Sequence, residues 1–145
     1  MYSNILIPTD GSELASKAVQ YGIALAKRIG ARATMLTVVP PFQVFTTDTH
    51  MLEDTSAQYK ARMQEHTKEV FGTAARTAQA AGVAYESIVV DHEHPYRAII
   101  DTAGSKGCDL IVMASHGRHG LAAIVLGSET VKVLTHSTIP VLVYR

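Results

Sequence analysis

The chain has 145 residues, of which 47% are apolar and 18% charged, so we expect one folded domain over residues 1–145 and no wholesale disorder. Thirteen basic residues balance thirteen acidic ones, which argues against a protein that coats nucleic acid. The single cysteine excludes an intrachain disulfide. The sequence has no long apolar stretch and no charged leader, so we expect a cytoplasmic protein with no membrane partner.

Five short apolar runs, most of them rich in β-branched residues, predict β-strands. They cover residues 5–7, 33–39, 84–90, 110–113 and 141–144. Each run is continuously apolar rather than alternating, which is typical of strands covered on both faces of a parallel sheet.

Four segments with a helical period lie between these strands. The first has apolar residues at Ala15, Ala18, Val19, Gly22, Ile23, Ala26 and Ile29, and ends at Gly30. The second has Met63, Val70, Ala74, Ala78 and Ala81, and ends at Gly82. The third starts at Pro95 with Tyr96, Ile99, Ile100 and Ala103 on one face, and the fourth starts at Ser128 with Val131 and Leu134 facing inward. This alternation predicts an α/β fold, an open doubly wound five-stranded parallel sheet with helices on both faces.

The connection over residues 40–54 is long for a strand-to-helix loop and has no clear period. It carries the apolar residues Phe42, Val44 and Phe45, whose side chains we expect to be buried against another surface. An ordered surface loop, a lid and a subunit contact all remain open for it.

Ligands of open parallel sheets bind beyond the carboxyl ends of the strands, so the first strand's end is a candidate site. There Asp10 fits the N-cap of the first helix, with Glu13 completing a capping box. The same carboxylate also suits ribose hydroxyls, a base amine or a metal-bound water. Ser12 suits either a phosphate contact or the solvated start of the helix.

A second candidate site follows the fourth strand, where Ala114–Gly117 precedes nine residues and then Gly127 and Ser128. Glycines let backbone N–H groups approach an anion, and a helix start favours phosphate. The combination of strand end, glycine loop and helix start predicts a phosphate site.

Three segments of the chain together resemble the universal stress protein family. They are residues 5–12 (ILIPTDGS), residues 109–117 (DLIVMASHG) and residues 126–128 with 139–143. The resemblance covers essentially the whole chain. It implies the strand order 3-2-1-4-5, which places the two candidate sites at one crevice.

The resemblance also implies how that crevice would hold ATP, with ADP or AMP as alternatives. Adenine and ribose would lie near Pro8, Thr9, Asp10, the backbone of Val39, Met113 and Ala114. The phosphates would rest on Gly117, Gly127, Ser128, Glu129 and Thr130, with a backbone contact from His116 and with Mg²⁺ bridging phosphate oxygens. The family's nucleotide-binding motif begins with glycine where this chain has Ala114, so we expect the methyl group to weaken binding without abolishing it.

Other reactive side chains have simpler interpretations. His92 and His94, with the acids Asp91 and Glu93, offer transition-metal ligands, but neighbours on one loop rarely converge on one ion, so a solvated loop is favoured. Cys108 is most simply a small apolar residue.

No catalytic constellation is evident, because His116 has no visible orienting partner and the chain has no P-loop motif. The leading hypothesis is an adenine-nucleotide-binding regulatory protein of the stress response, with slow or no hydrolysis and at most weak ATPase activity. The alternative is a dimeric interaction protein of the same fold that has lost nucleotide. In either case residues 141–144 would be an exposed apolar edge, which predicts a homodimer through this strand. An adenylating enzyme or a response-regulator receiver fits the sequence less well.

Overall fold

The computed structural model describes residues 1–42, 55–117 and 126–145. Strands and helices alternate in these residues, as predicted. The elements are β1 (Asn4–Pro8), α1 (Glu13–Ile29), β2 (Arg32–Val39), α3 (Ser56–Ala81), β3 (Tyr85–Asp91), α4 (Pro95–Ser105), β4 (Leu110–Ala114), α5 (Ser128–His136) and β5 (Val141–Tyr144).

The strands form one parallel sheet in the order β3-β2-β1-β4-β5, which confirms the expected topology. β1 lies at the centre, where Ile5 is paired with Ala33 of β2 on one side and Leu110 of β4 on the other. The chain therefore winds in one direction from β1 to β3 and in the other from β4 to β5. The carboxyl ends of β1 and β4 meet where the direction changes, which is where open sheets bind ligands.

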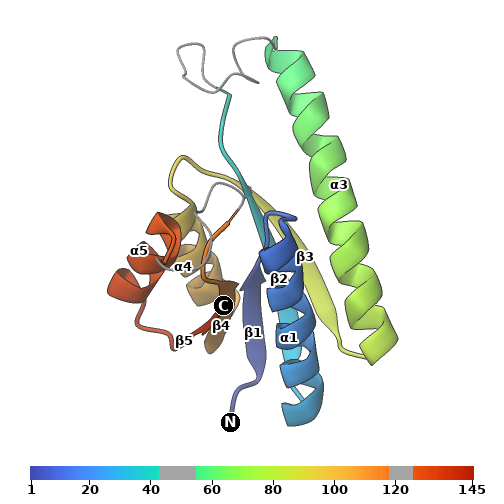
Figure 1. Cartoon of the computed structure of the whole chain (residues 1–145), viewed down its shortest axis with the longest axis vertical. Coiled ribbons are helices and arrows are strands. Elements are labelled where there is room, and N and C mark those ends of the chain that lie inside the picture. The colour runs from blue at the N-terminus through green and yellow to red at the C-terminus, as the bar shows by residue number, and fades with distance from the viewer. Residues whose placement is uncertain (43–54, 118–125) are drawn as a thin grey trace.

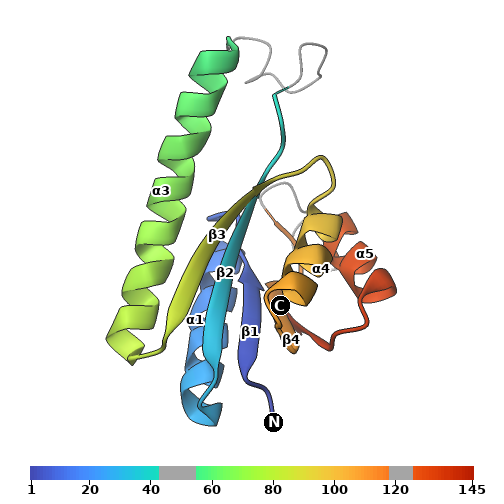
Figure 2. The same cartoon turned by 180° about the vertical axis from the view of Figure 1, so that it is seen from behind.

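Helices α1 and α3 cover one face of the sheet, and α4 and α5 cover the other (Figures 1 and 2). Ile5 and Ile7 of β1 pack in the cluster under α1 and α3, whereas Leu6 packs in the cluster under α4 and α5. All three side chains are fully buried. Successive side chains of a strand point to opposite faces, so these three neighbouring positions are all apolar because helices cover both faces of the sheet.

The start of α1 differs from the predicted capping box. Ser12 is the N-cap, and its hydroxyl accepts a hydrogen bond from the Ala15 N–H at 3.3 Å. Asp10 lies two residues earlier, where its Oδ1 accepts from the Ser12 N–H at 2.9 Å. Gly11, at φ 80°, turns the chain between them, a left-handed conformation that glycine adopts without strain. Asp10 thus supports the turn before the helix instead of capping the helix.

The predicted inward face of α5 is also wrong. Val131 and Leu134 are 44% and 42% exposed, whereas Thr130 and Val133 are buried. Burial of Thr130 is possible because its hydroxyl donates to the Ala114 carbonyl oxygen at 3.0 Å. At the end of α1, Ile29 is 38% exposed, so the apolar stripe of that helix ends at Ala26.

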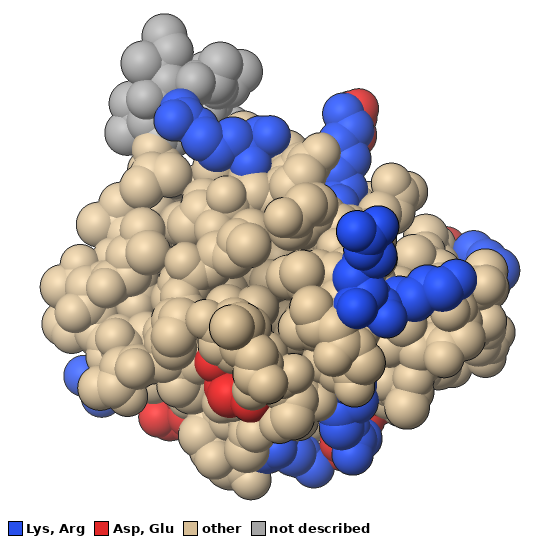
Figure 3. Space-filling view, turned by 90° about the horizontal axis from the view of Figure 1, so that it is seen from below, with Lys and Arg blue, Asp and Glu red and all other residues tan. Residues whose placement is uncertain are grey.

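The amino ends of the strands form the end of the molecule away from the candidate crevice, and Figure 3 shows this end with Lys and Arg side chains at several separate places around a mostly uncharged surface. Lys106 Nζ lies 2.8 Å from Glu86 there, and the Asp109 carboxylate accepts from the N–H groups of Ser3 and Asn4. The Asp109 contacts tie the start of β1 to the residue before β4, and the ion pair ties the end of α4 to β3. No helix in the described ranges is long and apolar enough to span a membrane.

Candidate functional site

A cavity of about 410 Å³ opens at the carboxyl ends of the central strands, between the β1–α1 turn and the start of α5. Every predicted site residue except Val39 lines this cleft: Pro8, Thr9, Asp10, Met113, Ala114, His116, Gly117, Gly127, Ser128, Glu129 and Thr130. The lining also includes residues that sequence reasoning did not select, namely Ala15, Leu36, Val38, Pro95 and Ile99. The volume falls within the range of small-molecule sites.

Val39 does not line the cleft, and the predicted contact of its backbone with adenine or ribose stays a prediction. Its side chain is buried, and its carbonyl oxygen accepts a hydrogen bond from the His92 N–H at 3.0 Å. Val38, its neighbour on β2, lines the cleft instead. Alternate side chains of a strand face opposite sides of the sheet, which is why the side chain of Val38, and not that of Val39, lies at the cleft.

One part of the cleft is apolar. Leu36 and Met113 come from β2 and β4, and Ile99 comes from α4. These three belong to the cluster that packs between the sheet and α4 and α5. This part offers a surface for a flat apolar group such as a nucleobase.

The polar part of the cleft is the first turn of α5. Gly127 is the N-cap, and no side chain caps this helix start. Within the described part of the chain no hydrogen-bond acceptor is recorded for the N–H groups of Ser128, Glu129 and Thr130. Unpaired N–H groups at a helix start bind anions, because their partial positive charges add to the helix dipole.

Gly127 itself does not fit the predicted role of an anion-binding amide. Its N–H already donates to the Ser115 carbonyl oxygen at 2.7 Å. A Cβ at this position would lie 3.1 Å from His116 Cα, so glycine is needed here for the close approach of two backbone segments. Gly127 therefore shapes the entrance to α5, and the next three amides carry the anion-binding potential.

Two side-chain contacts fix the first turn of α5 in place. The Thr130 hydroxyl bonds to Ala114 at the end of β4, as noted above. The Glu129 carboxylate accepts from the Tyr96 N–H, in the first turn of α4, at 2.9 Å and lies 3.7 Å from Lys132 Nζ. Glu129 and Tyr96 are 33 residues apart, so no local sequence signal could have paired them.

Asp10 faces Gly117 across the cleft. A Cβ at residue 117 would lie 2.6 Å from Asp10 Oδ2, too close for any side chain unless Asp10 moved. Gly117 therefore leaves room for the carboxylate as well as for a ligand. Residues 118–125, which join Gly117 to the segment before α5, lie outside the described residues.

Ala114 lines the cleft and is 8% exposed. It also belongs to a small cluster with Ala15 and Ala18 of α1. The methyl group thus has a place in the packing between β4 and α1, which the sequence alone did not reveal.

The remaining candidates lie away from the cleft or are enclosed. His92 Nδ1 accepts from the His94 N–H at 2.8 Å, and among the described residues no three His, Cys, Asp or Glu side chains gather as metal ligands. Cys108 is 5% exposed, and burial raises the pKa of its thiol. The neutral thiol is a weak nucleophile, in keeping with a packing role.

An open parallel sheet with a cleft at its topological switch point defines the class of doubly wound ligand-binding domains. The model of the universal stress protein family matches residues 1–145, and the chain belongs to this family. Universal stress protein YxiE of Bacillus subtilis is 31% identical over 149 residues, which cover both chains completely.

Solved structures support the same assignment. The structure of protein MJ0577, from Methanocaldococcus jannaschii, is 30% identical with a TM-score of 0.82 and covers 99% of this chain and 96% of its own. A universal stress protein solved in complex with cAMP is 23% identical with a TM-score of 0.73, over 99% of this chain and 97% of its own. At this level of identity, the similarity to the cAMP complex supports the fold alone.

Proposed function

We propose that the cleft binds an adenine nucleotide and that the protein acts as a nucleotide-responsive module of the stress response, with slow or no hydrolysis. The observation that carries the proposal is the pairing of two surfaces in one cavity. The apolar surface of Leu36, Ile99 and Met113 suits a base, and the uncapped first turn of α5 suits a phosphate. A protein of the same fold has been solved with cAMP, so the fold accommodates an adenine nucleotide.

The proposed pose follows from the position of these two surfaces. The base lies over Met113 and Leu36, the ribose lies near Asp10, and the phosphates reach the N–H groups of residues 128–130. Asp10 is suited to the ribose because a carboxylate accepts hydrogen bonds from both hydroxyls. Ser128 adds a hydroxyl donor at the first helical position.

Mg²⁺ enters this proposal with the nucleotide. Two carboxylates, Asp10 and Glu129, line the cleft, and Glu129 is already bonded to Tyr96 and paired with Lys132. Phosphate oxygens and water would therefore supply most of the ligands, an arrangement typical of Mg²⁺.

A homodimer through β5 is the second part of the proposal. β5 pairs only with β4 within the described sheet, and its four residues are only partly buried. Val131 and Leu134 add exposed apolar surface on neighbouring α5. Pairing two copies about a two-fold axis would cover this edge. Light scattering is expected to report a dimer for the wild type and a monomer for Val143→Lys, and a wild-type monomer at micromolar concentration would refute it.

The alternative of a dimeric interaction protein without nucleotide is favoured by one observation, the engagement of the Gly127 amide by Ser115. Titration calorimetry separates the two functions. The nucleotide proposal expects ATP, AMP or cAMP to bind at micromolar to low millimolar concentration, with adenosine weaker because it lacks the phosphate. Absence of heat with every nucleotide at millimolar concentration and with Mg²⁺ would leave only the interaction function.

A further inference from the structure

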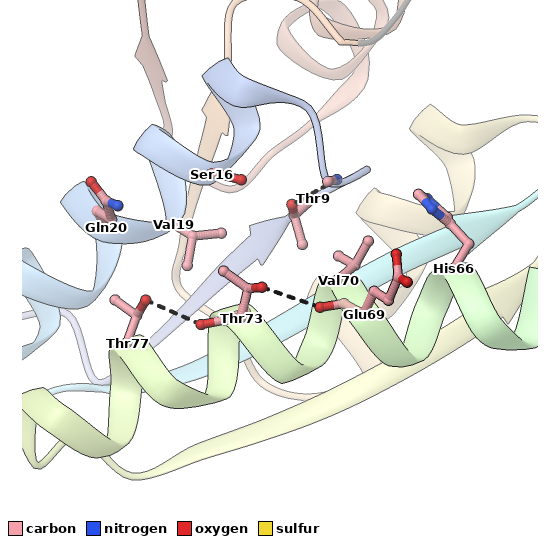
Figure 4. A pocket seen from close by; sticks show the side chains of 11 residues that line it. Thr9, Ser16, Val19, Gln20, His66, Glu69, Val70, Thr73 and Thr77 are labelled. Atoms are coloured by element: carbon pink, nitrogen blue, oxygen red, sulfur yellow. Dashed lines mark hydrogen bonds between the residues drawn. The ribbon is translucent and has the colours of Figure 1, made fainter.

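A second cavity, of about 230 Å³, lies between α1 and α3 on the face of the sheet away from α4 and α5 (Figure 4). Its lining is Thr9, Gly11, Ser16, Val19, Gln20, His66, Glu69, Val70, Thr73, Ala74 and Thr77. Only Thr9 is shared with the proposed nucleotide cleft. We propose that this groove is a separate binding site for a small aliphatic amine in its ammonium form.

The hydroxyl groups of α3 reach the groove as hydrogen-bond acceptors. Thr73 Oγ1 donates its proton to the Glu69 carbonyl oxygen at 3.3 Å, and Thr77 Oγ1 donates to the Thr73 carbonyl oxygen at 3.2 Å (Figure 4). A hydroxyl has one proton and two lone pairs, so each oxygen has only acceptor capacity left for a ligand. Thr73 gives one lone pair to Arg76 at 3.2 Å and keeps the other.

The charge of the groove also favours a cationic ligand. Glu69 contributes a carboxylate, which forms no ion pair with any side chain in the described ranges. Neither Lys nor Arg is among the described lining residues. An ammonium group carries three donors and no acceptor, so it matches a carboxylate surrounded by acceptor oxygens. Ser16, Gln20 and His66 also line the groove and can donate hydrogen bonds, so the preference for a cation over an anion rests on the Glu69 carboxylate.

The floor of the groove accounts for the aliphatic part of the ligand. Val19 of α1 and Val70 and Ala74 of α3 line the groove and are buried, and Figure 4 shows Val19 and Val70 between the polar side chains of the two helices. Methylene groups would cover this surface while the ammonium group reaches Glu69. A volume of 230 Å³ is that of roughly seven or eight water molecules, enough for a chain of four carbons with an amine at each end.

The test compares three ligands with the same four-carbon skeleton, titrated into nucleotide-free protein and followed by the amide shifts of α1 and α3. 1,4-Diaminobutane is the dication, 1,4-butanediol the neutral analogue and succinate the dianion. The proposal expects saturable shifts at the groove with the diamine, and shifts at least about fivefold weaker in affinity with the diol and succinate. Equal affinity for the diol, or no saturable shift with the diamine at tens of millimolar, would overturn it.

A pair of variants separates a specific site from general attraction to an acidic helix. Glu69→Gln removes the carboxylate in the groove, whereas Glu65→Gln removes one from an exposed position of α3 that does not line it. We expect Glu69→Gln to weaken diamine binding about fivefold and Glu65→Gln to change it less than about twofold at fixed ionic strength. Equal weakening by the two variants would show nonspecific attraction and overturn the proposal. The assay contains no nucleotide, so it does not depend on the function of the cleft.

Discussion

Substituting Ser128 with proline tests the phosphate site without disturbing the fold. Ser128 is the first helical residue of α5 and is exposed, a position where proline fits because its missing N–H has no intrahelical partner. The preceding residue, Gly127, has φ −60° and ψ 152°, the extended conformation that a residue before proline prefers. The proline ring would therefore replace one N–H group of the first turn of α5 with a methylene group at little conformational cost.

The expected loss of affinity follows from that single donor. A hydrogen bond to a charged group contributes about 1.5–3 kcal/mol, so Ser128→Pro should weaken ATP binding roughly 10- to 100-fold. Thermal stability should stay level or rise, because proline at a compatible position stabilises by about 0.4–1 kcal/mol. Ser128→Ala, the control, keeps the N–H and loses only the hydroxyl, so it should weaken binding much less. Calorimetric titration of the three proteins provides the measurement. If Ser128→Pro binds ATP as tightly as the wild type, the phosphate does not rest on this turn.

Three further outcomes follow from contacts around the cleft and the sheet. Thr130→Val should lower the free energy of unfolding, measured in urea, by about 1–3 kcal/mol, because the buried Ala114 carbonyl loses its hydrogen-bond donor. Thr135→Val is the control: its exposed hydroxyl bonds only within α5, so the loss should be less than about 0.5 kcal/mol. Ala114→Gly should destabilise the fold by about 1–2 kcal/mol through lost packing against Ala15 and Ala18, and it should tighten nucleotide binding because the methyl group no longer crowds the ligand; unchanged affinity would show that the methyl group does not obstruct the ligand. At Asp109, partial burial raises the carboxyl pKa, but hydrogen bonds from Ser3 and Asn4 outweigh it and leave the pKa below its usual value. The ionised carboxylate therefore stabilises the folded state above about pH 4, and this stabilisation is lost as the pH falls through the lowered pKa. Asp109→Asn should make the free energy of unfolding depend less on pH in acid. An unchanged pH dependence would contradict the lowered pKa of Asp109.

Much of the fold could be predicted from sequence because its signals are local and consistent. Residues 5–7 of β1 and all of β4 are apolar because helices cover both faces, and Gly30 ends α1 in the left-handed conformation that glycine favours. The strand order came from the family resemblance. Nothing in the periodicity of the chain alone places β4 beside β1.

The errors arise where tertiary contacts decide between similar patterns. In the nine-residue α5, Val131 and Leu134 have the apolar side chains expected of an inward face. The helix nevertheless buries Thr130, because the Ala114 carbonyl oxygen accepts a hydrogen bond from its hydroxyl. Asp10 and Ser12 are both good N-caps, and the turn at Gly11 selects Ser12. The site was predictable as a set of strand and helix ends, but the roles of Gly127 and Glu129 depend on contacts with Ser115 and Tyr96 that no spacing reveals.

The position of a bound phosphate group can be tested directly by comparing AMP with adenosine in amide NMR spectra. The two ligands share base and ribose, so the difference between their shift patterns reports the phosphate alone. We predict that the largest differences fall on the amides of Ser128, Glu129 and Thr130, with a smaller change at Gly127, whose N–H is already bonded to Ser115. Largest differences elsewhere in the protein, or identical patterns for the two ligands, would contradict a phosphate site at the start of α5.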